Sequence, residues 1–171
     1  MLKLPQEVVD LINNPESIKI VATVNEEGNP HSAVKDFFTL LADGNIAFAE
    51  EFEGSQTNVN LVRAIWFDKN VELTIKGKDG ATYQIKGKPY KYVYTGDLFK
   101  KFYLAARKKW GPDSELAGVW IITPEEVKNE TYEVRKKEED EKHPFFRHLD
   151  RTSVRKKPTT NDVSDEKTRL R

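Results

Sequence analysis

The sequence contains no cysteine, which excludes disulfide bonds, thiolate metal sites and cysteine nucleophiles. It has no excess of charge of one sign either, because 28 lysines and arginines balance 28 aspartates and glutamates. Nucleic-acid-binding proteins usually carry a basic excess, so we expect no nucleic-acid partner. No apolar run approaches the roughly 20 residues of a membrane span, and residues 1–5 lack the apolar core of a signal peptide. We therefore expect a cytoplasmic protein without a membrane partner.

Histidine is scarce as well. The three histidines, His31, His143 and His148, are scattered along the chain and do not have the spacing of metal ligands. His31 follows a turn proline and is expected at the surface. The sequence therefore predicts no metal site, and it offers no serine–histidine–aspartate arrangement that would identify a catalytic residue.

Alternating apolar and polar residues predict a mainly β protein. The expected strands cover residues 18–24, 31–41, 45–50, 70–76, 81–94, 117–123 and 131–135. Tight turns join most of them, so we expect an antiparallel sheet of six or seven strands and a small barrel. Helical spacing predicts three short helices over residues 5–13, 57–66 and 98–109, and residues 123–126 match the capping box that begins a helix.

The composition changes near residue 136. We expect residues 1–136 to form the folded domain, and residues 137–171 to form a charged C-terminal extension with too few apolar residues for a core. Its one apolar island contains Phe145 and Phe146. The extension is expected to be partly disordered, or docked on the barrel or on a partner subunit.

A loop with Ser55, Gln56 and Thr57 leads into the predicted helix that begins at residue 57. Exposed N–H groups and the positive end of the helix dipole make such a place a natural anion site. Ser55 or Thr57 can equally serve only as the N-cap of the helix. Both interpretations remain open from the residues alone.

The order of elements over residues 8–127 resembles the FMN-binding split-barrel proteins, the pyridoxamine 5′-phosphate oxidase-like superfamily. The matching features are the turn at 27–30, the Asp43-Gly44 turn, the loop and helix at 55–61 and the Thr-Pro-Glu-Glu run at 123–126. The chain looks particularly like the small FMN-binding proteins of anaerobic bacteria. The resemblance implies a six-stranded antiparallel split barrel that forms a homodimer, with FMN in two clefts at the subunit interface.

The resemblance also implies a cofactor site built from three segments. The strand after the first turn and the loop before the helix would hold the flavin phosphate, and an aromatic residue would lie against the isoalloxazine ring. The residues implied are Val34, Lys35, Asp36, Ser55, Gln56, Thr57, Asn60 and Trp110.

Two of these residues carry open alternatives. The Lys35 ammonium suits a phosphate dianion, although Lys35 could also face solvent or pair with Asp36. Gln56 stands where relatives carry a basic residue, and Glu50, Glu51 and Glu53 add negative charge nearby.

We expect an FMN-binding oxidoreductase or electron-transfer protein with an unidentified redox partner or small-molecule substrate. The flavin would carry the chemistry. The alternative is a non-enzymatic binding module for another phosphorylated or planar ligand, such as haem or a deazaflavin. A structural dimer with a vestigial cleft is a third possibility.

Overall fold

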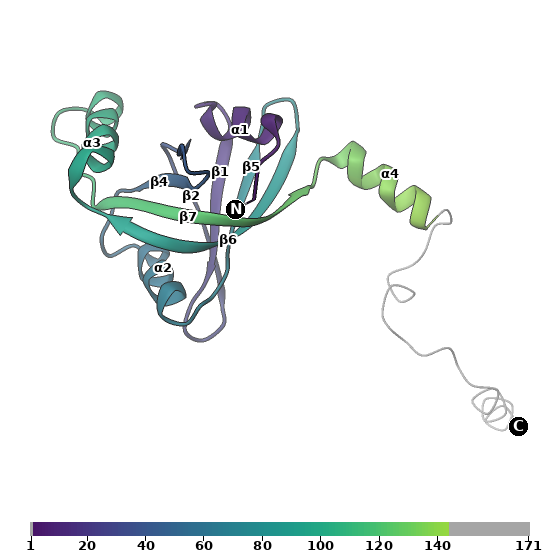
Figure 1. Ribbon diagram of the computed structural model, residues 1–171, viewed down its shortest axis with the longest axis horizontal. Helices are drawn as coiled ribbons and strands as arrows, with labels where there is room; N and C mark the ends of the chain where they lie inside the picture. The colour runs from purple at the N-terminus through teal and green to yellow at the C-terminus, as the bar shows by residue number, and fades with distance from the viewer. Residues whose placement is uncertain (1, 144–171) are drawn as a thin grey trace, which may run out of the picture. The chain divides into compact units, whose positions relative to one another are not determined.

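The computed structural model describes residues 2–143, in which seven strands form one antiparallel sheet (Figure 1). The strands follow the order β2-β1-β5-β6-β7-β4-β3 across the sheet. Their bounds are Ile18–Val24 (β1), Pro30–Val34 (β2), Thr39–Leu40 (β3), Ile46–Glu50 (β4), Val71–Lys76 (β5), Thr82–Val93 (β6) and Gly118–Asn129 (β7). The helices are Gln6–Asn13 (α1), Gln56–Trp66 (α2), Gly96–Trp110 (α3) and Tyr132–Lys142 (α4).

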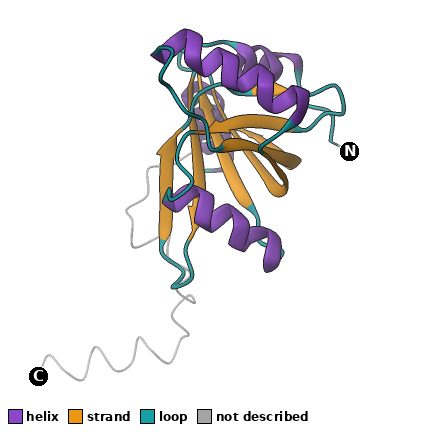
Figure 2. Ribbon diagram, turned by 90° about the vertical axis from the view of Figure 1, so that its left-hand side faces the viewer, coloured by secondary structure: helices purple, strands orange, loops and turns teal. Residues whose placement is uncertain are grey.

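Contacts divide the chain into residues 1–135 and residues 136–171. The first unit contains the sheet, which curves strongly with helices around it (Figure 2). Helix α1 contacts β3 and β5, α2 contacts β1, β2 and β6, and α3 packs on β6 and β7. None of the helices in residues 2–143 is long and apolar enough to cross a membrane.

Strand β4 is buried on both faces and separates two apolar clusters. Its Ile46 and Phe48 side chains belong to the main core between the sheet and α1 and α2. Its Ala47 and Ala49 side chains belong to a second cluster, which includes Phe102 of α3. The small alanine side chains leave room for α3 on this face, so the alternation of large and small residues in β4 fits its two partners.

The sheet has seven strands, which is within the six or seven expected from the residues but one more than the resemblance implies, and it does not close into a continuous barrel. The expected strand over residues 31–41 is interrupted, because Phe37 adopts a positive φ of 54° and separates β2 from β3. A left-handed residue cannot continue a strand. The mainly β, antiparallel character is confirmed, whereas the homodimer stays a prediction.

The capping box expected at residues 123–126 is wrong, because β7 runs through it without a break. Pro124 has no N–H to donate to the ladder. It pairs with Gly87 of β6, and the register of β6 and β7 shifts immediately before this pair, between Lys86 and Gly87. This irregularity accommodates the proline inside a long strand.

The strand expected at residues 131–135 is also wrong, because helix α4 begins at Tyr132. Its sequence is rich in Glu and Lys, which favour helices. Ion pairs one turn apart, such as Lys136–Asp140 at 2.9 Å, support the helix. Residues 144–171, including the expected Phe145-Phe146 island, lie outside the described residues.

We expect Gly87→Ala to lower the free energy of unfolding by about 1–3 kcal/mol, because this crowds a packed site. A Cβ at position 87 would lie 2.4 Å from the backbone oxygen of Thr123. Urea denaturation measures the change. Gly54→Ala is the matched control, since a Cβ there meets nothing within 4 Å, and its effect should stay within about 0.5 kcal/mol. Equal effects of the two substitutions would contradict the close strand contact.

Candidate functional site

A buried ion pair joins opposite sides of the sheet. Lys35 directly follows β2, the strand at one edge, and Glu50 ends β4, which lies next to the other edge. The Lys35 Nζ donates to both carboxylate oxygens of Glu50 at 2.8 Å. The two residues are 6% and 0% exposed. The alternative that Lys35 faces solvent is therefore wrong.

Backbone and side-chain bonds of Asp36 reinforce this closure. The Ala49 N–H of β4 donates to the Asp36 carbonyl oxygen at 3.4 Å. The Asp36 carboxylate accepts from the Lys109 Nζ of α3 at 2.8 Å, so Asp36 pairs with Lys109 and not with Lys35. We call the Lys35–Glu50 pair together with the Asp36–Ala49 hydrogen bond the seam.

Glu51 lies beside the seam. Its carboxylate is 3.9 Å from the Lys35 Nζ, which already bonds both oxygens of Glu50. Burial raises the pKa of the Glu51 carboxyl, Lys35 opposes the rise, and the neighbouring Glu50 and Asp36 charges add to it. The seam region therefore carries more carboxylates than cations.

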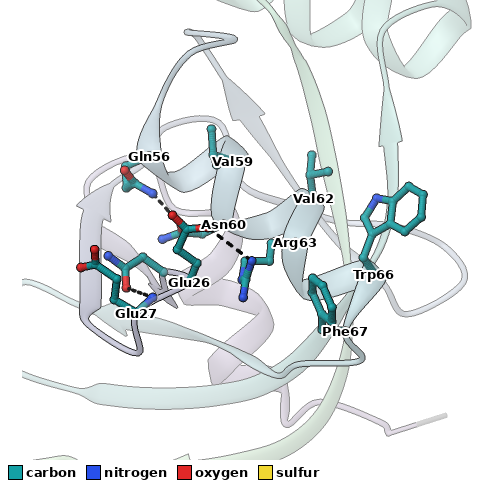
Figure 3. A pocket seen from close by; sticks show the side chains of 10 residues that line it. Glu26, Glu27, Gln56, Val59, Asn60, Val62, Arg63, Trp66 and Phe67 are labelled. Atoms are coloured by element: carbon teal, nitrogen blue, oxygen red, sulfur yellow. Dashed lines mark hydrogen bonds and ion pairs between the residues drawn. The ribbon is translucent and has the colours of Figure 1, made fainter.

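The loop before α2 uses its polar groups inside the chain. The Ser55 Oγ accepts from the Asn58 N–H at 3.0 Å, which confirms its role as N-cap. The Gln56 side chain donates to Asn60 at 2.7 Å (Figure 3). The Thr57 Oγ1 lies 3.2 Å from the Nε2 of His31.

Two residues of this region escaped the sequence analysis. His31, expected at the surface, is half-buried on β2, where its ring lies against Thr57. Asn58 is buried, accepts from the Trp120 indole N–H at 2.9 Å and donates to the Glu53 carbonyl at 2.7 Å. His31 and Thr57 are 26 positions apart, and Asn58 and Trp120 are 62 positions apart, so no local pattern reveals these contacts.

Two hollows receive the implied site residues. The helix hollow, of 430 Å³, lies between α2 and the turn after β1 (Figure 3). The Arg63 guanidinium stacks 4.7 Å from the Phe67 ring centre there. Its lining includes Glu26, Gln56, Asn60, Arg63, Trp66 and Phe67.

The seam hollow, of 480 Å³, opens beside the seam. It is lined by Val34, Asp36, Glu51, Phe52, Trp110, Ser114 and Glu115. The Trp110 ring meets the Phe37 ring edge-on with centres 5.0 Å apart, which fixes its orientation. Each hollow is in the size range of small-molecule sites.

The implied site residues are thus divided among three places. Val34, Asp36 and Trp110 meet in the seam hollow, whereas Gln56 and Asn60 line the helix hollow. The linings of these two hollows do not include Lys35, Ser55 or Thr57, whose polar groups have partners within the chain. Within residues 2–143 no group of three histidine, aspartate or glutamate side chains could hold a metal ion.

Comparison with solved structures gives matches over about three quarters of the chain. HupZ of Group A Streptococcus has a TM-score of 0.60 at 23% identity, over 76% of this chain and 96% of its own. An FMN-binding protein from Syntrophomonas wolfei has a TM-score of 0.59 at 13% identity, over 73% and 84%. HutZ, the haem storage protein of Vibrio cholerae, has a TM-score of 0.51 at 12% identity, over 75% and 95%.

Further matches include a candidate pyridoxamine 5′-phosphate oxidase from Lactobacillus delbrueckii and an F420 reductase. The chain shares its fold with these proteins, and this is the split-barrel fold that the sequence resemblance implies. No family profile and no curated protein matches the sequence. Split-barrel proteins with this fold include proteins named for FMN, haem and F420, so the fold leaves the ligand open.

The site fits one part of FMN and not the other. The seam hollow offers apolar and aromatic walls to a planar ring, through Val34, Phe52 and Trp110. The side chains implied for the phosphate do not fit it as they stand, because Lys35 is bound to Glu50 and the loop hydroxyls and Gln56 amide have partners within the chain.

We expect Glu50→Gln to destabilise the fold by roughly 3–5 kcal/mol, since it leaves a buried ammonium group without its anion. The free energy of unfolding, measured with urea, tests this. Glu16→Gln is the control, because it removes an exposed pair with Lys78 and should cost less than about 1 kcal/mol. A loss at Glu50 no larger than the loss at Glu16 would show that the pair does not hold the sheet.

Proposed function

We propose that the protein binds a flavin-type cofactor by its ring, in the seam hollow, and serves as an oxidoreductase or electron-transfer protein. The observation that carries the proposal is the convergence of Val34 and Asp36, next to β2, with Trp110 at the end of α3. The resemblance places Trp110 against the flavin ring and Val34 and Asp36 in the segment near its phosphate, and here the three residues line one hollow. The shared fold with an FMN-binding protein supports the same conclusion.

The chain's residues have defined roles in this proposal. Trp110 is held by Phe37 and by the Lys109–Asp36 pair, so its ring is positioned before the ligand arrives. Phe52 is an exposed apolar side chain that the ligand would cover. The bound flavin would supply hydride or single-electron transfer, and the surrounding charges would tune its potential.

A second candidate is a binding module for haem or a deazaflavin. It is supported by the shared fold with HutZ and with an F420 reductase, and by the engaged phosphate donors. In the described part of the chain, no histidine lines the seam hollow to serve as an axial haem ligand. The geometry therefore favours the flavin.

We expect the protein to quench flavin fluorescence on saturable binding, and Trp110→Ala to weaken that binding about three- to ten-fold, because an aromatic contact contributes about 0.5–1.5 kcal/mol. Tyr90→Ala is the control, since Tyr90 is an exposed aromatic residue outside the hollow. Flavin fluorescence that does not change when the protein is added would refute the proposal. A haem-type absorbance spectrum from the purified protein, without flavin bands, would favour the second candidate.

We further propose that the protein is a homodimer. Among the large aromatic residues, Phe38 and Trp120 lie in the core, whereas Trp66 is 79% exposed. Helix α2 buries Leu61 and Ala64 on one face. The helix and its C-cap residue also carry exposed apolar residues, and such residues mark an interaction surface when they gather on one face. The exposed residues are Val59, Val62, Ile65, Trp66 and Phe67.

A second copy is the cover that the charges on this face favour. Arg63 and Glu26 lie side by side, with 3.7 Å between Nη1 and Oε2, so two copies related by a two-fold axis could exchange these ion pairs.

Sedimentation velocity should show a dimer, and Trp66→Glu should convert it to a monomer, whereas Tyr90→Glu should not. A wild-type monomer at micromolar concentration would refute the dimer.

A further inference from the structure

We infer that the seam hollow selects uncharged planar ligands over anionic ones, so that it recognises the ring of a flavin without its phosphate. The ligand class this favours is riboflavin or another neutral flavin, with FMN as the weaker ligand. The inference rests on the proposed function, because it concerns the same hollow.

The first argument is the charge of the lining. Three carboxylates, those of Asp36, Glu51 and Glu115, line the hollow, and in the described chain no lysine, arginine or histidine does. Val34, Phe52 and Trp110 are its exposed apolar residues, so an uncharged ring gains their contact without meeting an opposing charge. A phosphate dianion entering the hollow would meet the negative charge of these three carboxylates.

The second argument is that the nearest cations are already neutralised. The Lys35 ammonium bonds both oxygens of the fully buried Glu50 at 2.8 Å. The Lys109 ammonium bonds Asp36 at 2.8 Å. Each of these ammonium groups bonds one carboxylate, and Glu51 and Glu115 add further negative charge to the lining. For Lys35 to hold a phosphate, it would have to leave Glu50 buried without a partner, which costs more than the new bond returns.

The third argument concerns the loop before α2. The Ser55 hydroxyl caps Asn58, and the Gln56 amide bonds Asn60, which in turn donates to Thr23 at 2.9 Å. Asn60 and Thr23 are both buried, so this chain of bonds cannot readily turn outward. At the positions where the resemblance places a phosphate site, Lys35 is engaged by Glu50 and residues 55–57 contain no lysine or arginine.

The test is a pair of fluorescence-quenching titrations, with riboflavin and with FMN, on the full chain. At low salt, about 20 mM, riboflavin should bind about three- to ten-fold more tightly than FMN, since charges there are poorly screened. Raising the salt to about 300 mM should increase the affinity for FMN until it approaches that for riboflavin, and should leave the affinity for riboflavin unchanged.

Glu115→Gln should increase the affinity for FMN about two- to three-fold, because one repelling charge is removed from the lining. The affinity for riboflavin should not change. Glu27→Gln is the matched control, as Glu27 is an exposed carboxylate on the turn after β1 and does not line the seam hollow. It should change neither affinity.

Two outcomes would overturn the inference, and they are distinguishable. In the first outcome, FMN binds ten-fold more tightly than riboflavin, and this difference disappears in Lys35→Met. Lys35 would then hold the phosphate. The inferred preference for uncharged ligands would be wrong, and the proposed function would stand. In the second outcome, the folded protein quenches the fluorescence of neither flavin. The proposed function would then be refuted, and so would the inference that rests on it.

Discussion

The ion pair between Lys35 and Glu50 is the constraint on which the site depends. An isolated charge of either sign would be very costly at these buried positions, so each residue requires the other. Because the two residues come from strands near opposite edges of the sheet, their pairing fixes the distance between those edges. The same contact that closes the split barrel removes the cation best placed to bind a phosphate.

Neighbouring contacts extend the seam into the binding region. Gly118 pairs with Glu50 and faces the Tyr92 ring, where a Cβ would come within 2.3 Å. The Tyr92 ring lies against Trp120, with centres 4.9 Å apart, and the Trp120 indole N–H holds Asn58 at the start of α2. The loop before α2 and the seam are therefore joined by one continuous set of packed and hydrogen-bonded side chains.

The sequence predicts those parts of this structure that local rules govern. Period-two alternation locates most of the strands, and Ser55 marks the start of α2 because an N-cap is a local feature. The break at Phe37 and the uninterrupted strand through Pro124 depend on tertiary contacts, so the pattern at residues 31–41 and 123–126 misleads. Glu50, the partner of Lys35, is 15 positions away. No periodicity in the sequence reveals that the Lys35 ammonium is bound to it. The grouping of Val34 and Asp36 with Trp110 came from the family resemblance, not from the residues alone.

A double-mutant cycle on Lys35→Met and Glu50→Leu tests the central claim most directly. The account predicts that each single substitution strongly lowers the free energy of unfolding, because it leaves an unpaired buried charge, and that the double variant recovers most of the loss. The resulting coupling energy should exceed about 2 kcal/mol. Additive effects of the two substitutions would show that the residues act independently, and the seam would then not be what closes the sheet.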